Sequence, residues 1–344
     1  DYEGLRVIAV DDRSTDGTRE RLRDLAESDD RLEVVAIDAL PDGWLGKTNA
    51  LHQGAGRARS DWLLFTDADV RFDPSALRRL IAFADRESAD HVVVGPDDPA
   101  PETRSAGERM FLALFGMLLI LGREPWRLAN PRSRAFLGIG AGNLVRRSAF
   151  LEIGGFEPIR LSVDDDLRLG QALKWSGYRQ RFAAGRDCIA VRWQEGVWGM
   201  LRGIEKNAFA AMDFNPLGPF LGLLCAWVLC VAPLAGLAFG DWIVRAISLV
   251  GLLACFGWFR MIERSTRIPP VFALTLPLGL GLVWFAVIRS MVLTLRRGGV
   301  VWRGTLYSLA LLKGHIRERR RWMRARWRAR SETSVAEEHE RARM

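Results

Sequence analysis

The sequence contains little cysteine, only four residues in 344. Cys225, Cys230 and Cys255 lie in apolar runs, where a thiol behaves as a small hydrophobic side chain. Cys188 stands alone, which excludes a disulfide framework and a paired-cysteine zinc motif. The chain also lacks a repeat of about 20–50 residues, so it is not a solenoid. Its 13 Trp and 17 Phe occur in regular apolar patterns, which excludes a disordered chain.

Charge is distributed unevenly along the chain. There are 49 Lys and Arg against 41 Asp and Glu, a net charge of +8. Residues 1–215 are mixed and charged, residues 217–295 carry long apolar runs, and residues 313–344 are rich in arginine. This pattern predicts a soluble domain, a membrane region and a basic tail. No signal peptide is visible, and an apolar strand begins soon after Asp1, so we expect an earlier segment to precede this chain.

Strand and helix patterns alternate in the first third of the chain. Strands are expected at residues 5–10, 32–37, 62–66 and 91–95, and helices at 18–28, 47–58 and 75–85. This alternation predicts an α/β fold with a mostly parallel sheet and helices on both faces.

Acidic residues follow two of these strands. Asp11 and Asp12 end the first strand, and Asp67 and Asp69 end the third, which places four carboxylates on one rim of the sheet. Each pair is also compatible with an ordinary turn. Like charges this close repel unless a cation lies between them, and hard oxygen ligands suit Mg²⁺ or Mn²⁺, which bridge readily to a diphosphate.

A third acidic cluster, Asp164-Asp165-Asp166, precedes a helix expected at 167–176. One interpretation is an acidic first turn that favours the helix dipole. The other is that crowding raises the pKa of one carboxylate and makes it a general base.

Three stretches, 218–239, 242–259 and 270–295, approach the length of about 20 residues that crosses a bilayer. Basic residues between 260 and 267 and between 313 and 330 both indicate the cytoplasmic side. Three complete crossings would separate these two segments, so the pattern favours a re-entrant third stretch, broken near Pro277.

Two amphipathic segments flank the apolar region. Residues 195–213 carry an apolar stripe, which is either core packing or a helix lying in the membrane surface. Residues 317–330 interleave Trp322 and Trp327 with arginines, as nucleic-acid or membrane binders do. Because this tail follows a membrane region, we expect anionic headgroups and no nucleic acid as its partner.

Several motifs now occur in a recognisable order. They are YEGLRVIAVDDRSTDGT at 2–18, GKTNALHQG at 46–54, Asp67-Ala68-Asp69, Gly154-Gly155-Phe156, and Asp165-Asp166 running to Gly177-Tyr178-Arg179. This set resembles the family 2 glycosyltransferases. Trp44-Leu-Gly46-Lys47, residues 203–207 and residues 301–307 are similar to the membrane-bound members that glycosylate lipids, such as hopanoid-associated, carotenoid-acid and ceramide glycosyltransferases.

The resemblance implies a GT-A fold and a nucleotide-sugar donor, with a UDP-sugar expected. By matched position, the nucleotide-sugar site would comprise Asp11, Asp12, Gly46, Lys47 and Asp67. Asp69, with Asp67, would bind Mg²⁺ or Mn²⁺. Asp166 would be the catalytic base of an inverting reaction, with Asp165 beside it, and Trp198, Lys206 and Asn207 would serve the acceptor and membrane interface.

The chain departs from the family pattern in three ways. Compared with the family pattern, we expect the first strand and helix, and with them part of the nucleotide pocket, to be missing from this sequence. Asp165 replaces the usual Glu, and Asp164 shifts the possible register of the base. The Gln-x-x-Arg-Trp motif of processive members is not present as such, and Lys206-Asn207 occupies its place.

We therefore expect a hexosyltransferase that transfers one sugar to a membrane lipid. The alternatives are a processive polysaccharide synthase and, from another class, a basic membrane- or nucleic-acid-binding protein. The expected segments are an N-terminally incomplete GT-A domain (1–194), an amphipathic interfacial helix (195–215), a transmembrane region (216–297) and a basic cytoplasmic segment (298–344). We expect a multi-pass protein of the cytoplasmic (inner) membrane, with its catalytic domain in the cytoplasm.

Overall fold

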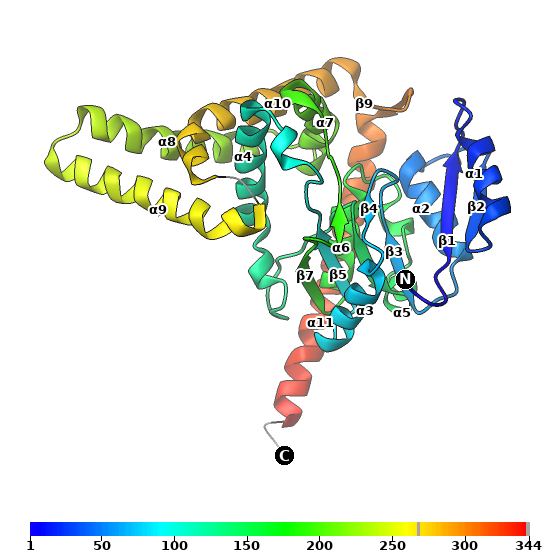
Figure 1. Cartoon of the computed structure of the whole chain (residues 1–344). Helices are drawn as coiled ribbons and strands as arrows, with labels where there is room; N and C mark the ends of the chain where they lie inside the picture. Colours follow the sequence, from blue (N-terminus) through cyan, green and yellow to red (C-terminus); the bar gives the residue numbers. More distant parts are fainter. Residues whose placement is uncertain (267–268, 342–344) are drawn as a thin grey trace. The chain divides into compact units, whose positions relative to one another are not determined.

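The computed structural model describes residues 1–266 and 269–341, which form two compact units (Figure 1). The sheet unit comprises Asp1–Pro96, Glu124–Val191 and Gly314–Met344, and the helical unit comprises Asp97–Arg123 and Arg192–Lys313. The sequence analysis divided the chain into consecutive segments. In the structure, each unit is instead built from two or three ranges that are separated in the sequence. Residues 97–123 belong with the apolar helices, and the basic C-terminal stretch belongs with the sheet.

The first third of the chain contains all seven expected strands and helices, each within two residues of its expected bounds. The helices and strands of the sheet unit are β1 (Val7–Asp12), α1 (Thr18–Ser28), β2 (Leu32–Ile37), α2 (Gly46–Arg57), β3 (Trp62–Phe65), β4 (Arg71–Phe72), α3 (Ala76–Arg86), β5 (His91–Gly95), η2 (Pro125–Arg127), β6 (Asn143–Arg146), α5 (Arg147–Glu152), η3 (Glu157–Ile159), α6 (Asp165–Trp175), β7 (Gln180–Ala184) and β8 (Ile189–Ala190).

The central sheet has four strands in the order β3-β6-β5-β7. β5 is parallel to β7, and β6 is antiparallel to both β3 and β5, so three of the four strands run in one direction. β1 and β2 form a separate parallel pair, and β4 and β8 form a short antiparallel one. The mostly parallel α/β fold predicted from the sequence is therefore confirmed, although the sequence pattern did not predict two strands of this sheet, β6 and β7.

Helices cover both faces of this sheet. Leu144 and Val145 are neighbours on β6 but belong to different buried clusters, because successive side chains of a strand point to opposite faces. The Val145 cluster includes Ile153 and Leu173 from the segments around α5 and α6, and the Leu144 cluster includes Leu80 from α3.

The helical unit contains the apolar helices. Its elements are η1 (Pro101–Thr103), α4 (Ala106–Arg123), α7 (Gly196–Ala211), α8 (Leu217–Phe239), α9 (Trp242–Thr266), η4 (Pro270–Thr275), α10 (Leu276–Arg297) and the antiparallel hairpin β9 (Gly299–Trp302) and β10 (Thr305–Ser308). Within the described ranges, three stretches are long and apolar enough to cross a membrane: Phe220–Phe239, Trp242–Met261 and Pro270–Arg297.

The third stretch is not broken at Pro277, contrary to the sequence prediction. Pro277 lies in the first turn of α10, where a missing backbone N–H leaves no helical hydrogen bond unmade. From Leu276 the helix continues for 22 residues, which is about the length that a complete crossing needs.

The apolar stripe of α7 is a packing face. Leu201, Ile204 and Phe209 are at most 8% exposed and pack in one cluster or its surroundings with residues of α4 and α10. Of the two interpretations left open by the sequence, core packing therefore describes this face. Trp198 is different, because it is 46% exposed and lies beside Phe285 of α10.

The basic C-terminal stretch forms α11 (Leu309–Arg341). Met323 is 2% exposed and packs in the core of the sheet unit, with Trp322 against it. The ring of Trp327 lies 5.9 Å from that of Trp175 in α6. These tryptophans therefore pack partly against the protein, and the guanidinium groups of Arg326 and Arg330 lie over the rings of Trp322 and Trp327.

Candidate active site

Lys47 joins two acidic residues that are distant in the sequence. Its Nζ lies 2.7 Å from Oδ1 of Asp67, just after β3, and 3.6 Å from Oδ2 of Asp165, the first residue of α6. Lys47 itself lies in the first turn of α2. Three residues predicted for the site thus come together from three separate elements.

Backbone contacts hold these three residues in place. The Asp67 N–H donates to the Gly140 carbonyl at 2.9 Å. A Cβ at Gly140 would lie only 2.5 Å from Asp67 Oδ2, so a side chain there would displace the carboxylate. The Leu45 N–H and the Thr48 hydroxyl both donate to the Arg160 carbonyl, at 3.0 and 2.5 Å. The loop before α2 is therefore fixed to the segment that precedes α6.

The two aspartates at the end of β1 have different environments. Asp11 is 2% exposed, and it accepts hydrogen bonds from Arg19 Nε at 2.6 Å and from the Ser14 N–H at 3.2 Å. Burial raises the pKa of Asp11, but these hydrogen bonds outweigh burial, and the pKa is below its usual value. Asp12 lies against Gly46, where a Cβ would come 2.4 Å from Oδ2. Asp12 is thus the residue of the pair that adjoins the Lys47 cluster.

Asp69 is exposed and forms no ion pair with any residue that the structure describes. The described residues also contain no group of three or more His, Cys, Asp or Glu that could hold a metal ion. Magnesium commonly binds one or two carboxylates together with substrate phosphates. Asp67 and Asp69 therefore fit a metal ion shared with a diphosphate ligand, but not one held by protein ligands alone.

The three aspartates around the start of α6 have three different partners. Asp164 Oδ2 lies 2.9 Å from Nε of Arg168, one turn later. Asp165 pairs with Lys47. Asp166 Oδ1 accepts the Leu167 N–H at 2.7 Å and has no basic side chain as an ion-pair partner among the described residues. Of the three, Asp166 is the carboxylate not neutralised by a salt bridge.

Burial gives these carboxylates an increased affinity for protons. It raises the pKa of Asp165 to about 7; Lys47 partly opposes the shift, and the neighbouring carboxylates add to it. Burial also raises the pKa of Asp166, again with partial opposition from Lys47. For Lys47, burial lowers the pKa, but the attraction of the three carboxylates Asp165, Asp67 and Asp166 outweighs it, and the ammonium stays charged.

Close backbone contacts beneath α6 were missed by the sequence analysis. A Cβ at Gly138 would lie 1.8 Å from the Asp166 carbonyl oxygen, and a Cβ at Gly170 would lie 1.8 Å from that of Leu137. These glycines allow the segment before β6 to pack directly on α6. The run Gly138-Ile-Gly140-Ala-Gly142 is the sequence signal that indicates such a close approach.

A buried polar network fixes the same segment. His91, fully buried on β5, contacts Asn143 Oδ1 at 3.1 Å and Gln180 Nε2 at 2.8 Å. The Gln180 side chain accepts from the Leu137 N–H and donates to the Gly170 carbonyl. Burial lowers the pKa of His91 to about 4, so the network is uncharged at neutral pH and positions the backbone beneath α6.

The residues expected at the acceptor interface belong to the helical unit. The guanidinium groups of Arg202 and Arg289 lie 5.6 and 5.5 Å from the ring centre of Trp198. Asn207 is partly buried on α7, and its Oδ1 has no hydrogen-bond partner among the described residues. The side chain of Lys206 lies outside the part of the chain that the structure describes.

Comparison with known proteins relates the N-terminal part of this chain to a protein family. Residues 1–154 match the sequence profile of Glycosyl transferase family 2. Over these residues, somewhat less than half of the chain, the sequence is similar to a family 2 glycosyltransferase domain. This match agrees with the family 2 resemblance, the GT-A fold class and the type of enzyme predicted from the sequence. The match includes Asp12, Lys47 and Asp67, whereas the α6 aspartates and everything after them lie beyond it.

Two relatives are similar to this chain over most of its length. A 4,4'-diaponeurosporenoate glycosyltransferase of Staphylococcus haemolyticus is 24% identical over 69% of this chain, and the matched region spans 62% of that protein's length. The succinoglycan biosynthesis protein ExoA of Rhizobium meliloti is 27% identical over 85% of this chain and 87% of its own.

Among solved structures, the mannosyltransferase PcManGT from Pyrobaculum calidifontis, in complex with GDP-Man and Mn²⁺, is similar at a TM-score of 0.47. Its sequence identity is 18%, with coverage of 83% of this chain and 78% of that one.

Proposed function

We propose that this enzyme transfers a single sugar from a nucleotide-sugar donor to a membrane lipid, with inversion at the anomeric carbon. The observation that carries the proposal is the Lys47–Asp67–Asp165 cluster in a chain that also has three candidate membrane-spanning helices. The name of the Staphylococcus relative, 4,4'-diaponeurosporenoate glycosyltransferase, supports a lipid-type acceptor.

On the donor side, Asp11, Asp12 and Gly46 would border the nucleoside, and Lys47 would lie along the diphosphate. A lysine ammonium binds phosphate as a point charge, and Lys47 stays charged because of its carboxylate neighbours. A UDP-sugar is the donor we expect.

On the acceptor side, Asp166 would act as the general base. The acceptor O–H bond breaks and its proton passes to the Asp166 carboxylate as the acceptor oxygen bonds to the anomeric carbon. The bond from that carbon to the diphosphate oxygen breaks on the opposite face, and the nucleoside diphosphate leaves. The raised pKa of Asp166 suits this role, because a general base works best when its pKa approaches the working pH.

A divalent ion, Mg²⁺ or Mn²⁺, would be held chiefly by Asp69, because Asp67 is already paired with Lys47. When bound, it neutralises negative charge on the departing diphosphate. We expect Asp69→Ala to abolish metal-dependent donor binding, measured by calorimetry with and without chelator, and to leave the melting temperature unchanged because Asp69 is exposed. Full transfer activity in chelator-treated wild type would exclude the metal role.

The chain would reside in the cytoplasmic (inner) membrane with its catalytic site on the cytoplasmic side. Exposed arginines of α11 support this orientation through the enrichment of basic residues on the cytoplasmic side of membrane proteins; they are Arg317, Arg320, Arg321, Arg324 and Arg328. This surface also supports anionic headgroups as partners of α11, with no role for nucleic acid.

To test the proposed function, membranes that contain the full chain are incubated with a panel of labelled nucleotide sugars, and lipid extracts are analysed by mass spectrometry. The expected product is a lipid heavier by one sugar. A second candidate, polysaccharide synthesis, is favoured by the name of the ExoA relative. A labelled product that grows to a long polymer would establish that alternative and exclude single transfer.

A further inference from the structure

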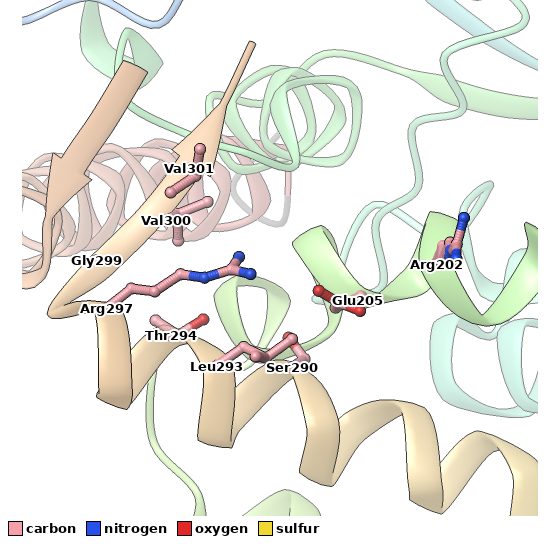
Figure 2. Close-up of a pocket in the computed structure, with 9 residues that line it drawn as sticks. All are labelled: Arg202, Glu205, Ser290, Leu293, Thr294, Arg297, Gly299, Val300 and Val301. Atoms are coloured by element: carbon pink, nitrogen blue, oxygen red, sulfur yellow. The ribbon is translucent and has the colours of Figure 1, made fainter. Parts of the chain in front are cut away.

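The helical unit contains a polar pocket at one end of α10 (Figure 2). It has a volume of about 80 Å³ and lies between α7, the last turns of α10 and β9. The lining residues are Arg202, Glu205, Ser290, Leu293, Thr294, Arg297, Gly299, Val300 and Val301.

The pocket carries an excess of positive charge. The only acidic lining residue, Glu205, accepts a hydrogen bond from Arg289 Nε at 2.7 Å and is thereby neutralised. Arg202 and Arg297 form no ion pair with any residue in the described ranges. Two guanidinium groups therefore lack a counter-charge in this pocket.

The remaining polar groups are hydrogen-bond donors. Ser290 Oγ accepts the Phe209 N–H at 3.1 Å, so its hydroxyl hydrogen is available to donate. Thr294 lies one turn further along α10, and Figure 2 shows its side chain and that of Arg297 rising from α10 toward α7. A pocket rich in guanidinium and hydroxyl donors is complementary to a carboxylate or a phosphate.

The position of the pocket indicates what carries that anion. The candidate membrane span Pro270–Arg297 ends at Arg297, beside the pocket. The end of a membrane span lies where the hydrocarbon of a bilayer meets the headgroups. Leu293, Val300 and Val301 supply apolar walls. The ligand therefore has an anionic end and an apolar body.

We propose that this pocket binds the anionic headgroup, phosphate or carboxylate, of a membrane lipid. If the proposed function holds, the lipid held here is of the acceptor class, which is then an anionic lipid and not a neutral one. The binding step itself requires no nucleotide sugar, so it can be measured separately from sugar transfer.

The test measures binding to the full chain in neutral detergent by native mass spectrometry. The probes are phosphatidic acid, dodecanoate, dodecanol and inorganic phosphate. Arg297→Gln removes one unpaired charge, and Arg202→Gln removes the other. Arg296→Gln is the matched control, because Arg296 is the adjacent exposed arginine of α10 and does not line the pocket.

We expect phosphatidic acid and dodecanoate to bind wild type and Arg296→Gln equally. Arg297→Gln and Arg202→Gln should each weaken binding by about 10-fold or more, the usual effect of losing a hydrogen bond to a charged group. Equal affinity in all four proteins, or equal binding of dodecanol, would overturn the proposal. Inorganic phosphate that binds as tightly as phosphatidic acid would show that the site takes a free anion and not a lipid.

A negative sugar-transfer assay with intact, Arg297-dependent lipid binding would reject the proposed function and leave the pocket assignment standing. Normal transfer by Arg297→Gln, with an unchanged KM for the acceptor, would instead reject the pocket as the acceptor site.

Discussion

The three consecutive aspartates at the start of α6 have identical side chains but different hydrogen-bond and ion-pair partners. Asp164 is paired with Arg168 and Asp165 with Lys47, whereas Asp166 accepts a backbone N–H and forms no salt bridge with the residues that the structure describes. The sequence left open whether this run is an acidic helix cap or a catalytic group. These contacts support the proposed division of roles: Asp164 pairs with Arg168 at the helix start, Asp165 pairs with Lys47, and Asp166 would accept the proton.

The raised pKa of Asp165 predicts a pH-dependent stability. Its folded pKa is about 7, above the ordinary value of 3.8, so between about pH 4 and pH 7 the folded state binds more protons than the unfolded state. The contribution of Asp165 to stability therefore falls as the pH rises through this window. Asp165→Asn has no titrating group at this position, so it lacks this loss of stability. The difference in melting temperature, variant minus wild type, should therefore increase from pH 4 to pH 8.

Thermal melts at pH 4, 6 and 8 in one detergent provide the measurement. Lys47 keeps Asp67 as its partner in this variant, so no buried ammonium is left unpaired. Wild type and Asp165→Asn curves that remain parallel across this range would contradict the assigned burial of the Asp165 charge.

At the scale of elements, α6 is positioned by direct backbone packing. Its glycine, Gly170, faces the Leu137 carbonyl, and Gly138 faces the Asp166 carbonyl. Because Gly138 and Gly170 have no side chains, the backbone before β6 can pack directly on α6, and this contact positions the candidate-site carboxylates at the start of α6.

A pair of helical glycines tests this packing. Gly170→Ala places a Cβ 1.8 Å from the Leu137 oxygen, so α6 must shift. We expect a destabilisation of about 1–3 kcal/mol or more from overpacking, with a large loss of turnover. Gly56→Ala in α2 is the control, because its Cβ meets nothing within 4 Å, and alanine in a helix interior stabilises by roughly 0.5–1 kcal/mol. Denaturant unfolding measures the free energy of unfolding of both variants. Equal changes in Gly170→Ala and Gly56→Ala would contradict direct backbone packing at Gly170.

At the scale of the whole molecule, the C-terminal helix completes the sheet unit. Arg319, only 4% exposed on α11, donates to Ser162 Oγ at 2.9 Å, two residues before Asp164. Arg330 donates to the Lys174 carbonyl at 2.7 Å, near the other end of α6. The chain therefore uses its last helix to hold the segment that carries the proposed base.

This contact makes Arg319 a positioning residue. We expect Arg319→Met to lower kcat by about tenfold and to lower the melting temperature, whereas Arg317→Met, an exposed neighbour on α11, should change neither. A double-mutant cycle with Ser162→Ala should give a coupling energy of about 0.5–3 kcal/mol, as for other residues in contact. Additive effects would show that Arg319 acts elsewhere.

Local patterns predicted much of this architecture. Short-range periodicity and turn chemistry predicted the alternation of strands and helices before residue 95 and the aspartates at strand ends. Of the predicted site residues, Lys47, Asp67 and Asp165 form ion pairs in the structure. The assignment of α4 to the helical unit, the strand β6 and the inward packing of Trp322 and Trp327 depend on contacts between distant segments. The sequence alone could not predict these contacts, because an apolar segment has the same pattern whether it faces a membrane, a ligand or the protein core.

In the proposed mechanism, the α6 carboxylate Asp166 activates a membrane acceptor for attack on a nucleotide sugar. The most direct test measures the rate at which membranes containing the full chain move label from a nucleotide sugar into lipid, for wild type, Asp166→Asn and Asp164→Asn. Loss of general-base catalysis should lower the rate of Asp166→Asn by about 10²–10⁴ with donor affinity little changed, while Asp164→Asn keeps most of its turnover per folded molecule. An active Asp166→Asn beside an inactive, folded Asp164→Asn would contradict the account and move the base two residues earlier.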